Sequence, residues 1–248
     1  MIIAAGALSG CTTPAPTSGT GTPTASTPGT TKTPTGANAK ASVTQSGDTI
    51  TITGTKTDDD NDQLSEQFTL TQGTYIYTFS NTGSALGNTF IASVDSPDGD
   101  LYEAVSLGDS SGMGYIAVDP DGFWAKPGPA VLSVGYGGTY TMTISKPTTG
   151  DAPPVTLTGQ PRETAVKAVN LNAGPVTINV RHNGYSSDQQ GTTMVSLHKV
   201  DNAKSVSLDG AWIMDETGQA TGTVAEPGLY VFSVSFRAHT TGEATLTQ

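Results

Sequence analysis

The sequence is short of cysteine, of basic residues and of long apolar runs, and each shortage excludes a class of protein. One cysteine among 248 residues excludes a disulfide framework and any zinc site built from several cysteines. Lysine and arginine number 11 against 22 aspartates and glutamates, so the net charge is -11. Nucleic acid is therefore not an expected partner, because phosphate binding needs clustered basic side chains. No run of 18 apolar residues predicts a membrane-spanning helix.

The single cysteine, Cys11, follows a short apolar segment and the residues Leu8, Ser9 and Gly10. A branched apolar residue, two small residues and a cysteine resemble the lipobox of secreted lipoproteins. The resemblance implies that residues 1–10 are a signal peptide, incomplete because no basic residue precedes the apolar segment, and that Cys11 receives a diacylglyceryl group. Membrane lipid is then a partner, and the chain lies on the extracellular face of the cell membrane. The alternative is an apolar tail with a chance cysteine.

Residues 11–41 combine the lipidated cysteine with a linker rich in threonine, proline and glycine. Between positions 12 and 35 there are eleven threonines and five prolines, and Lys32 is the only charged residue. This composition cannot bury an apolar core and predicts a disordered stalk. The stalk would hold the folded residues away from the membrane.

From about position 42 the chain has the pattern of short antiparallel strands. Apolar residues alternate with threonine at 49–53 and 140–144, which is typical of strands with one buried face. Turn pairs such as Asp98-Gly99 and Asn183-Gly184 separate these segments. No segment has the periodicity of an amphipathic helix, so we expect an all-β fold.

The two halves of this region repeat one pattern. Phe68-x-Leu70-x-x-Gly73-x-Tyr75 returns 101 residues later as Val169-x-Leu171-x-x-Gly174-x-Val176, and Pro127-Gly128 returns as Pro227-Gly228. Such collinearity predicts a tandem duplication of a unit of ~100 residues. We expect two antiparallel, jelly-roll-like β-sandwiches after the disordered stalk, an acidic one at 42–146 and a second one at 147–248.

The repeated unit resembles the pre-peptidase C-terminal-like sandwich domains of bacteria and archaea, and the jelly-roll modules of many secreted lipoproteins. The resemblance rests on the motif that begins at Phe68, on the apolar strand after it and on Pro127-Gly128. It implies an extracellular accessory or binding module and carries over no catalytic residue. The second copy has valine and isoleucine where the first has tyrosine and phenylalanine, which preserves an apolar core but changes the side chains that a common ligand would meet.

A catalytic site is not expected. The segment Gly108-Asp109-Ser110-Ser111-Gly112 fits Gly-x-Ser-x-Gly, but a nucleophile elbow needs a helix after the serine, and none is predicted. The three histidines that could act as the base, His182, His198 and His239, all belong to the other copy. We therefore expect a protein that is not an enzyme.

Calcium is the one cofactor that the sequence suggests, at the acidic segment 58–66. Asp58, Asp60 and Asp62 have the one-three-five spacing of calcium loops, and Glu66 follows. The glycine and glutamate that complete an EF-hand are not at their positions, so we expect an irregular loop site. The alternative is a set of solvated turn residues, which aspartate favours.

Three large aromatic residues lie in or beside turns and are candidate ligand contacts. Phe123 and Trp124 follow Asp121-Gly122, and Trp212 follows Asp209-Gly210. Exposed rings on sandwich loops can stack on sugars or anchor a protein. The alternative, which we favour from the sequence, is that each ring folds back and closes the end of its sandwich.

These observations favour a lipid-anchored extracellular protein whose two sandwiches bind an envelope component or have a structural role. The alternative is an accessory module of an exported enzyme system that holds a substrate or polysaccharide. The expected partner in either case is a surface polysaccharide or an envelope protein. The acidity is uneven, because residues 42–146 carry 13 acidic and three basic residues, against nine and six at 147–248.

Overall fold

The computed structural model describes residues 40–57, 61–84, 89–107, 110–122, 125–183, 192–236 and 241–248. All of them belong to one compact unit, Gly36–Gln248. Every regular element among them is a β-strand, and every strand pairing is antiparallel. Within these ranges no helix has the length and apolarity needed to cross a membrane. The prediction of an all-β fold is confirmed.

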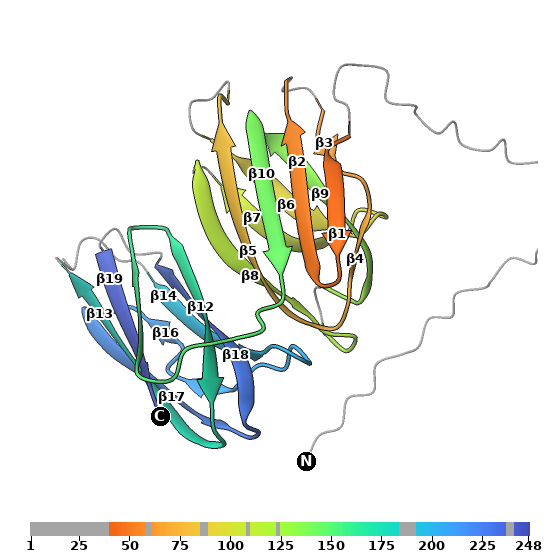
Figure 1. Cartoon of the computed structure of the whole chain (residues 1–248). Helices are drawn as coiled ribbons and strands as arrows, with labels where there is room; N and C mark the ends of the chain where they lie inside the picture. Colours follow the sequence, from red (N-terminus) through yellow and green to blue (C-terminus); the bar gives the residue numbers. More distant parts are fainter. Residues whose placement is uncertain are drawn as a thin grey trace, which may run out of the picture. The chain divides into compact units, whose positions relative to one another are not determined.

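Two sheets form a sandwich from the first half of the described chain (Figure 1). One sheet has the order β1 (Ser42–Ser46), β2 (Thr49–Thr55), β10 (Thr139–Ser145), β5 (Gly73–Thr82) and β8 (Ser111–Val118). The other has the order β3 (Gln63–Leu64), β9 (Gly128–Tyr136), β6 (Ile91–Asp95) and β7 (Leu101–Leu107), and β4 (Phe68–Leu70) also pairs with β9.

Two further sheets form a second sandwich from the remaining strands. One has the order β11 (Val155–Gly159), β19 (Thr241–Thr247), β13 (Gly174–Asn183), β17 (Thr217–Val224) and β15 (Leu208–Asp209). The other has the order β12 (Thr164–Leu171), β18 (Gly228–Phe236), β14 (Thr193–Lys199) and β16 (Trp212–Ile213).

The two sandwiches share one strand order, apart from the additional strands β1 and β3 of the first and β15 of the second. The order β2-β10-β5-β8 corresponds to β11-β19-β13-β17, and the order of β9, β6 and β7 corresponds to β18, β14 and β16. Many strands that are neighbours in one sheet are distant in the sequence, such as β2 and β10 or β11 and β19, as in the double-sheet jelly roll. The pairs β1–β2 and β6–β7 are neighbours in both the sheet and the sequence. Residues at equivalent places in the two copies can therefore be compared pair by pair.

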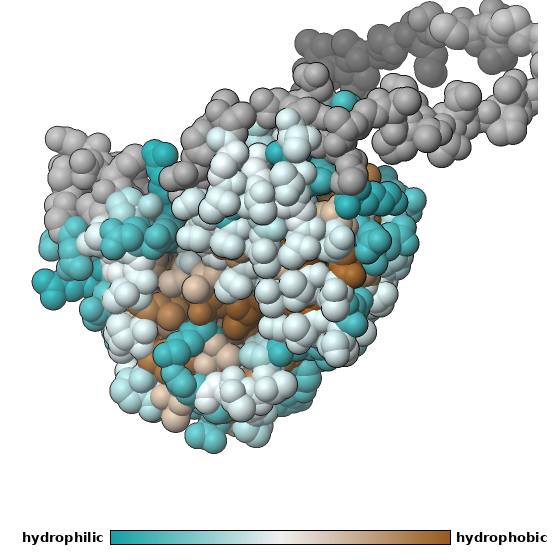
Figure 2. Space-filling model, turned by 45° about the horizontal axis from the view of Figure 1, so that its top comes forward, coloured by the Kyte–Doolittle hydropathy of each residue, from teal (hydrophilic) through white to brown (hydrophobic). Residues whose placement is uncertain are grey.

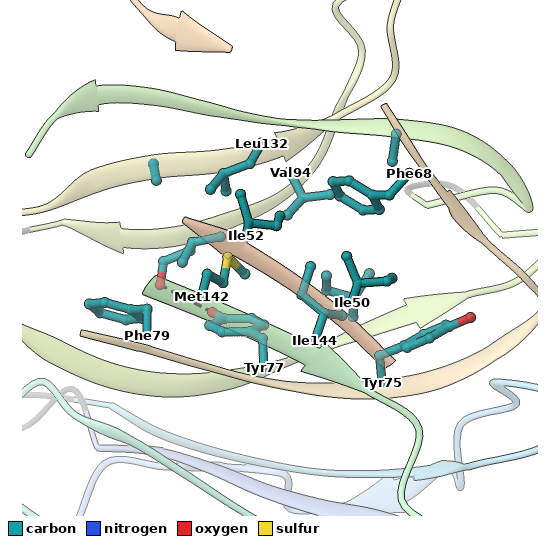
Figure 3. Close-up of a cluster of buried hydrophobic side chains, with 14 of the residues drawn as sticks. Ile50, Ile52, Phe68, Tyr75, Tyr77, Phe79, Val94, Leu132, Met142 and Ile144 are labelled. Carbon is teal, nitrogen blue, oxygen red and sulfur yellow. Dashed lines mark hydrogen bonds between the residues drawn. The ribbon is translucent and has the colours of Figure 1, made fainter. Parts of the chain in front are cut away.

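The core of the first sandwich is filled by the inward positions of alternating strands. Ile50 and Ile52 of β2 are fully buried, while the threonines beside them face outward. Figure 3 shows them between the side chains of β5 and β10 and those of the opposite sheet. Phe79 and Phe90 stack with ring centroids 5.1 Å apart. Burying each large apolar side chain contributes about 1.5–3 kcal/mol, so this alternation stabilises the sandwich.

The second core has the same plan with smaller residues on its long strand. Val176, Ile178 and Val180 of β13 are buried where β5 has tyrosine and phenylalanine. Phe232 and Phe236 of β18 supply the large rings and are fully buried. The second sandwich thus keeps a closed core although aliphatic residues replace the aromatic ones of the first, as the sequence predicted.

The two sandwiches are joined by a small apolar cluster and by backbone hydrogen bonds. Val166, Val200 and Val231 of the second sandwich pack with Ile76 and Tyr115 of the first. The Thr74 N–H donates to the Val200 carbonyl oxygen at 2.9 Å. The Thr74 hydroxyl donates to the Lys199 carbonyl oxygen, also at 2.9 Å.

Candidate functional site

Several of the residues singled out in the sequence lie outside the described residues. They are Leu8, Ser9, Gly10, Cys11, Asp58, Asp60, Phe123 and Trp124. The lipid anchor, half of the calcium ligands and two of the three aromatic contacts therefore remain sequence-based predictions.

The two described residues of the predicted calcium site hydrogen-bond to different strands. The Ser133 hydroxyl of β9 donates to an Asp62 carboxylate oxygen at 3.0 Å. The Val43 N–H of β1 donates to a Glu66 carboxylate oxygen at 3.1 Å. Burial raises the pKa of Asp95, and the negative charge of Asp62 adds to this effect. Asp62 thus lies near the carboxylate of Asp95, which belongs to β6. Glu66, in contrast, hydrogen-bonds to the edge strand β1.

Trp212 is exposed, so the favoured prediction that its ring closes the end of the sandwich is wrong. Its side chain is 64% exposed, whereas the next residue, Ile213, is buried. Because neighbouring side chains of a strand point to opposite faces, Trp212 lies on the outer face of its sheet. Its cross-strand neighbour is Met194 of β14. Trp212 therefore remains a candidate contact for a ligand or partner.

A second candidate surface, which the sequence did not single out, lies on the opposite sheet of the same sandwich. The outward side chains of β13, β17 and β19 surround a shallow hollow of about 500 Å³. Six polar residues line it, and we call this surface the polar hollow: Asn179, Arg181, Thr217, Gln219, Glu243 and Thr245. It lies on the exposed faces of three adjacent strands of one sheet, which hold its side chains in fixed register.

The register places these residues in two rows across the strands. Asn179 pairs with Gln219 on one side and with Thr245 on the other. Arg181 pairs with Thr217 and with Glu243 in the same way. Only one hydrogen bond between side chains of these six is present, from Gln219 Nε2 to Asn179 Oδ1 at 2.9 Å. Within the described residues, the side chains of Arg181 and Glu243 form no hydrogen bond or ion pair with another side chain.

The equivalent face of the first sandwich carries short or apolar side chains. The positions of Asn179 and Arg181 are taken by Thr78 and Ser80, 101 residues earlier. The strand registers place Met113 at the position of Gln219. Figure 2 shows one face of the molecule on which pale, weakly polar residues predominate beside a band of apolar ones. Comparing the two copies at the offset of 101 marks Asn179 and Arg181 in the sequence, whereas Gln219 is matched with Met113 only through the strand registers.

A third group of polar residues lies where the two sandwiches meet. The Ser196 hydroxyl donates to the Tyr115 hydroxyl at 3.2 Å, and the Tyr115 and His198 rings lie 4.8 Å apart. Burial lowers the pKa of His198 and raises the pKa of Glu103 to about 7. Glu103 in turn raises the pKa of Tyr115, although burial has the larger effect. These shifts arise chiefly from burial at the contact between the two sandwiches.

His182 is a buried structural residue. Its ring hydrogen-bonds to the Asp215 carbonyl oxygen through Nδ1 and to the Thr193 hydroxyl through Nε2, both at 2.7 Å. Its side chain is 1% exposed. Since both ring nitrogens already have protein partners, His182 is not available as a base or a metal ligand.

Comparison with known proteins gives only weak structural likenesses. No protein-family model matches the sequence. No curated protein matches it either. Isomalto-dextranase of Arthrobacter globiformis, solved with panose, is 13% identical over 81% of this chain, with a TM-score of 0.21. This chain spans 34% of that enzyme's length.

Two further solved structures are of the same order of similarity. A conserved protein of unknown function from Pseudomonas aeruginosa is 13% identical, with a TM-score of 0.20 over 82% of this chain and 91% of its own. Oxalate decarboxylase of Lactobacillus farciminis, in a formate complex, is 9% identical, with a TM-score of 0.16 over 84% and 83%. At these TM-scores none of the three bears on what this chain does.

Proposed function

We propose that this chain is a non-catalytic lipoprotein of the extracellular cell surface, whose sandwiches bind a component of the cell envelope. The observation that carries the proposal is the polar hollow. It presents amide, guanidinium and carboxylate groups on an exposed sheet face, and the described part of the chain leaves most of their hydrogen-bonding capacity unused. Such a surface is suited to holding a polar ligand, because each group can exchange water for a ligand atom.

The proposed anchor is a diacylglyceryl group on Cys11. Its support is the order Leu8-Ser9-Gly10-Cys11 at the end of an apolar segment. Two acyl chains hold a protein firmly on a bilayer, at ~0.8 kcal/mol per buried methylene, whereas one chain gives marginal and reversible binding. The linker rich in threonine and proline would let the sandwiches reach ligands beyond the bilayer surface.

The anchor is tested by comparing the unmodified chain with Cys11→Ala in cells fed radiolabelled palmitate. We expect the unmodified chain to carry the label and to be found in the membrane fraction. Cys11→Ala should be unlabelled and released from the membrane. Ser9→Ala is the matched control, because it keeps a small residue beside the cleavage site and should remain labelled. A labelled Cys11→Ala chain would overturn the assignment.

The binding role is tested by capture of envelope components on the full-length chain in detergent micelles. We expect retention of an envelope polysaccharide or protein, with no turnover of the captured material. Capture of a secreted enzyme as the main partner would favour the alternative role of accessory module. Chemical cleavage of a captured component by the purified chain would contradict a non-catalytic function.

A further inference from the structure

We propose that the polar hollow is the ligand-binding site and that its ligand is an uncharged polysaccharide lying across β13, β17 and β19. This inference rests on the proposed binding function and goes further, because it assigns the site and the chemical class of the ligand. It is carried by the geometry of the two rows, by their unused hydrogen-bonding groups and by the comparison with the first sandwich.

The two rows form a flat patch of a size suited to a sugar chain. Each row crosses three adjacent strands, as in Thr245–Asn179–Gln219. Strands lie about 4.8 Å apart and residues rise about 3.4 Å along them. The patch therefore extends roughly 10 Å across the strands and roughly 7 Å between the rows. Its side chains project from regular strands, which hold them in fixed relative positions.

The unused groups are donors and acceptors in alternation. The Arg181 guanidinium has five N–H donors and the Glu243 carboxylate has only acceptors. Asn179 retains its amide N–H donors, and Gln219 retains its carbonyl acceptor, since their mutual bond uses Gln219 Nε2 and Asn179 Oδ1. A hydroxyl both donates and accepts, so a ligand with several adjacent hydroxyls can satisfy both kinds of group at once.

The charges of the patch favour a neutral ligand. Arg181 and Glu243 are direct cross-strand neighbours, so their charges cancel for a ligand that covers both. An anionic polymer would meet the Glu243 carboxylate and a chain with a net charge of -11. A cationic polymer would meet the Arg181 guanidinium at the centre of its row. Uncharged sugars avoid both repulsions.

The fold alone does not account for these side chains. Thr78, Ser80 and Met113 occupy the equivalent sheet positions in the first sandwich. The strands there have the order β10-β5-β8, which corresponds to β19-β13-β17. Any exposed residue that suits a strand would therefore satisfy the fold at these positions. Two amides and an arginine–glutamate pair at one face of one copy indicate a use beyond folding.

Trp212 is not part of this site. It belongs to the sheet β12-β18-β14-β16, and the polar hollow belongs to the opposite sheet of the sandwich. The proposed recognition therefore depends on hydrogen bonds and not on a stacking ring. Affinity for one sugar unit should consequently be weak, and a long chain should bind better than a short one.

The test is affinity electrophoresis of the full-length chain in detergent through native gels that contain one polysaccharide each. The probes are neutral dextran, neutral galactomannan, anionic polygalacturonate and cationic chitosan oligosaccharides. In a buffer with enough salt to screen the net charge of -11, we expect retardation by at least one neutral polymer and by neither charged one. Arg181→Ala and Gln219→Ala should each weaken the retardation roughly tenfold, as expected for loss of one or two hydrogen bonds to the ligand.

Matched controls separate the site from general effects on the chain. Ser80→Ala and Thr78→Ala alter the equivalent positions of the first sandwich and should leave the retardation unchanged. Arg181→Lys keeps the charge but loses the planar fork of donors, and should lie between the unmodified chain and Arg181→Ala. Circular dichroism shows whether each variant keeps its β-structure.

Two results would overturn the inference in different ways. Retardation by a neutral polymer that persists in Arg181→Ala and Gln219→Ala would place the binding elsewhere and leave the proposed binding function intact. Retardation by a charged polymer alone, or by none of the four, would reject an uncharged polysaccharide as the ligand. In that case capture of an envelope protein would still support the proposed function, whereas capture of nothing would reject both.

Discussion

Asn81 and His182 occupy the same position in the two sandwiches, 101 residues apart. Each is the last inward-facing residue of the long strand, β5 or β13, and each is almost fully buried. The Asn81 N–H donates to the Ser110 carbonyl oxygen at 2.6 Å, and the His182 N–H donates to the Glu216 carbonyl oxygen at 2.8 Å. Each side chain also bonds to a neighbouring segment. At this position each copy therefore has a buried polar side chain that hydrogen-bonds the end of the long strand to a neighbouring segment, and the two copies use different residues for it.

We predict that His182→Ala lowers the free energy of unfolding by about 1–3 kcal/mol, because the buried Thr193 hydroxyl loses its partner. His182→Asn should recover part of this loss, since asparagine is the residue that the first copy uses at the same place. Urea unfolding of the full chain measures both values. Equal destabilisation by His182→Ala and by the exposed Thr221→Ala would contradict the structural role of His182.

Much of the fold follows from the alternation of apolar residues and threonine. The patterns at 49–53 and 140–144 correspond to β2 and β10, whose inward residues Ile50, Ile52, Met142 and Ile144 are all fully buried. Alternation predicts such strands well, because one face must be apolar and the other must meet water. The order of the strands in each sheet does not follow from alternation, which says nothing about which strands pair.

The contact between the sandwiches does not follow from alternation either, for a related physical reason. It uses Ile76, Tyr115 and Val231, which lie on faces that alternation assigns to solvent. The available signal was the continuous apolar run Tyr230, Val231 and Phe232, since a strand buried on both faces loses its alternation. The polar hollow was missed because outward polar residues are expected on any strand. Only their difference from Thr78 and Ser80 marks them.

Gly73 and Gly174 provide a matched test of this contact. They begin β5 and β13 with φ of +134° and +139°, so alanine would strain the backbone similarly at both. A Cβ on Gly73 would collide with the Val200 carbonyl oxygen of the other sandwich, whereas one on Gly174 would meet no atom within 4 Å. We predict that Gly73→Ala lowers the free energy of unfolding by about 1–3 kcal/mol more than Gly174→Ala, as for other overpacked sites.

Urea unfolding of the two variants measures this difference, and amide hydrogen exchange at Thr74 reports on the contact itself. The Thr74 N–H donates to the Val200 carbonyl oxygen, so its exchange should accelerate in Gly73→Ala and stay slow in Gly174→Ala. Equal effects of the two substitutions on both measurements would show that the sandwiches do not pack in this way.

Calcium binding at the acidic segment remains a sequence-based prediction with a direct test. If Asp58, Asp60 and Asp62 share an ion, calcium at about 100 times its dissociation constant should stabilise the full chain by ~2.7 kcal/mol. Asp62→Asn should remove most of this gain, while its side chain can still accept the Ser133 hydrogen bond. Asp209→Asn, in the second sandwich, is the control. Thermal unfolding that is the same in calcium and in a chelator would reject the site.

Glu103 should make stability fall as pH rises through the weakly acidic range. Burial raises the pKa of its carboxyl from 4.5 to about 7 in the folded chain. Between these values the folded state keeps the proton and the unfolded state has lost it, so each rise in pH favours unfolding. The loss begins near pH 4.5, ends near pH 7 and amounts to about 3 kcal/mol.

The matched variant for this prediction is Glu103→Gln, which keeps the shape and removes the ionisation. The difference in unfolding free energy between the unmodified chain and the variant isolates Glu103 from His198, whose lowered pKa has the opposite effect on stability. We expect this difference to be constant below pH 4.5, to shift against the unmodified chain between about pH 4.5 and 7, and then to level off. Urea unfolding at a series of pH values measures it. A difference that does not change with pH would mean that Glu103 ionises as freely in the folded chain as in the unfolded one.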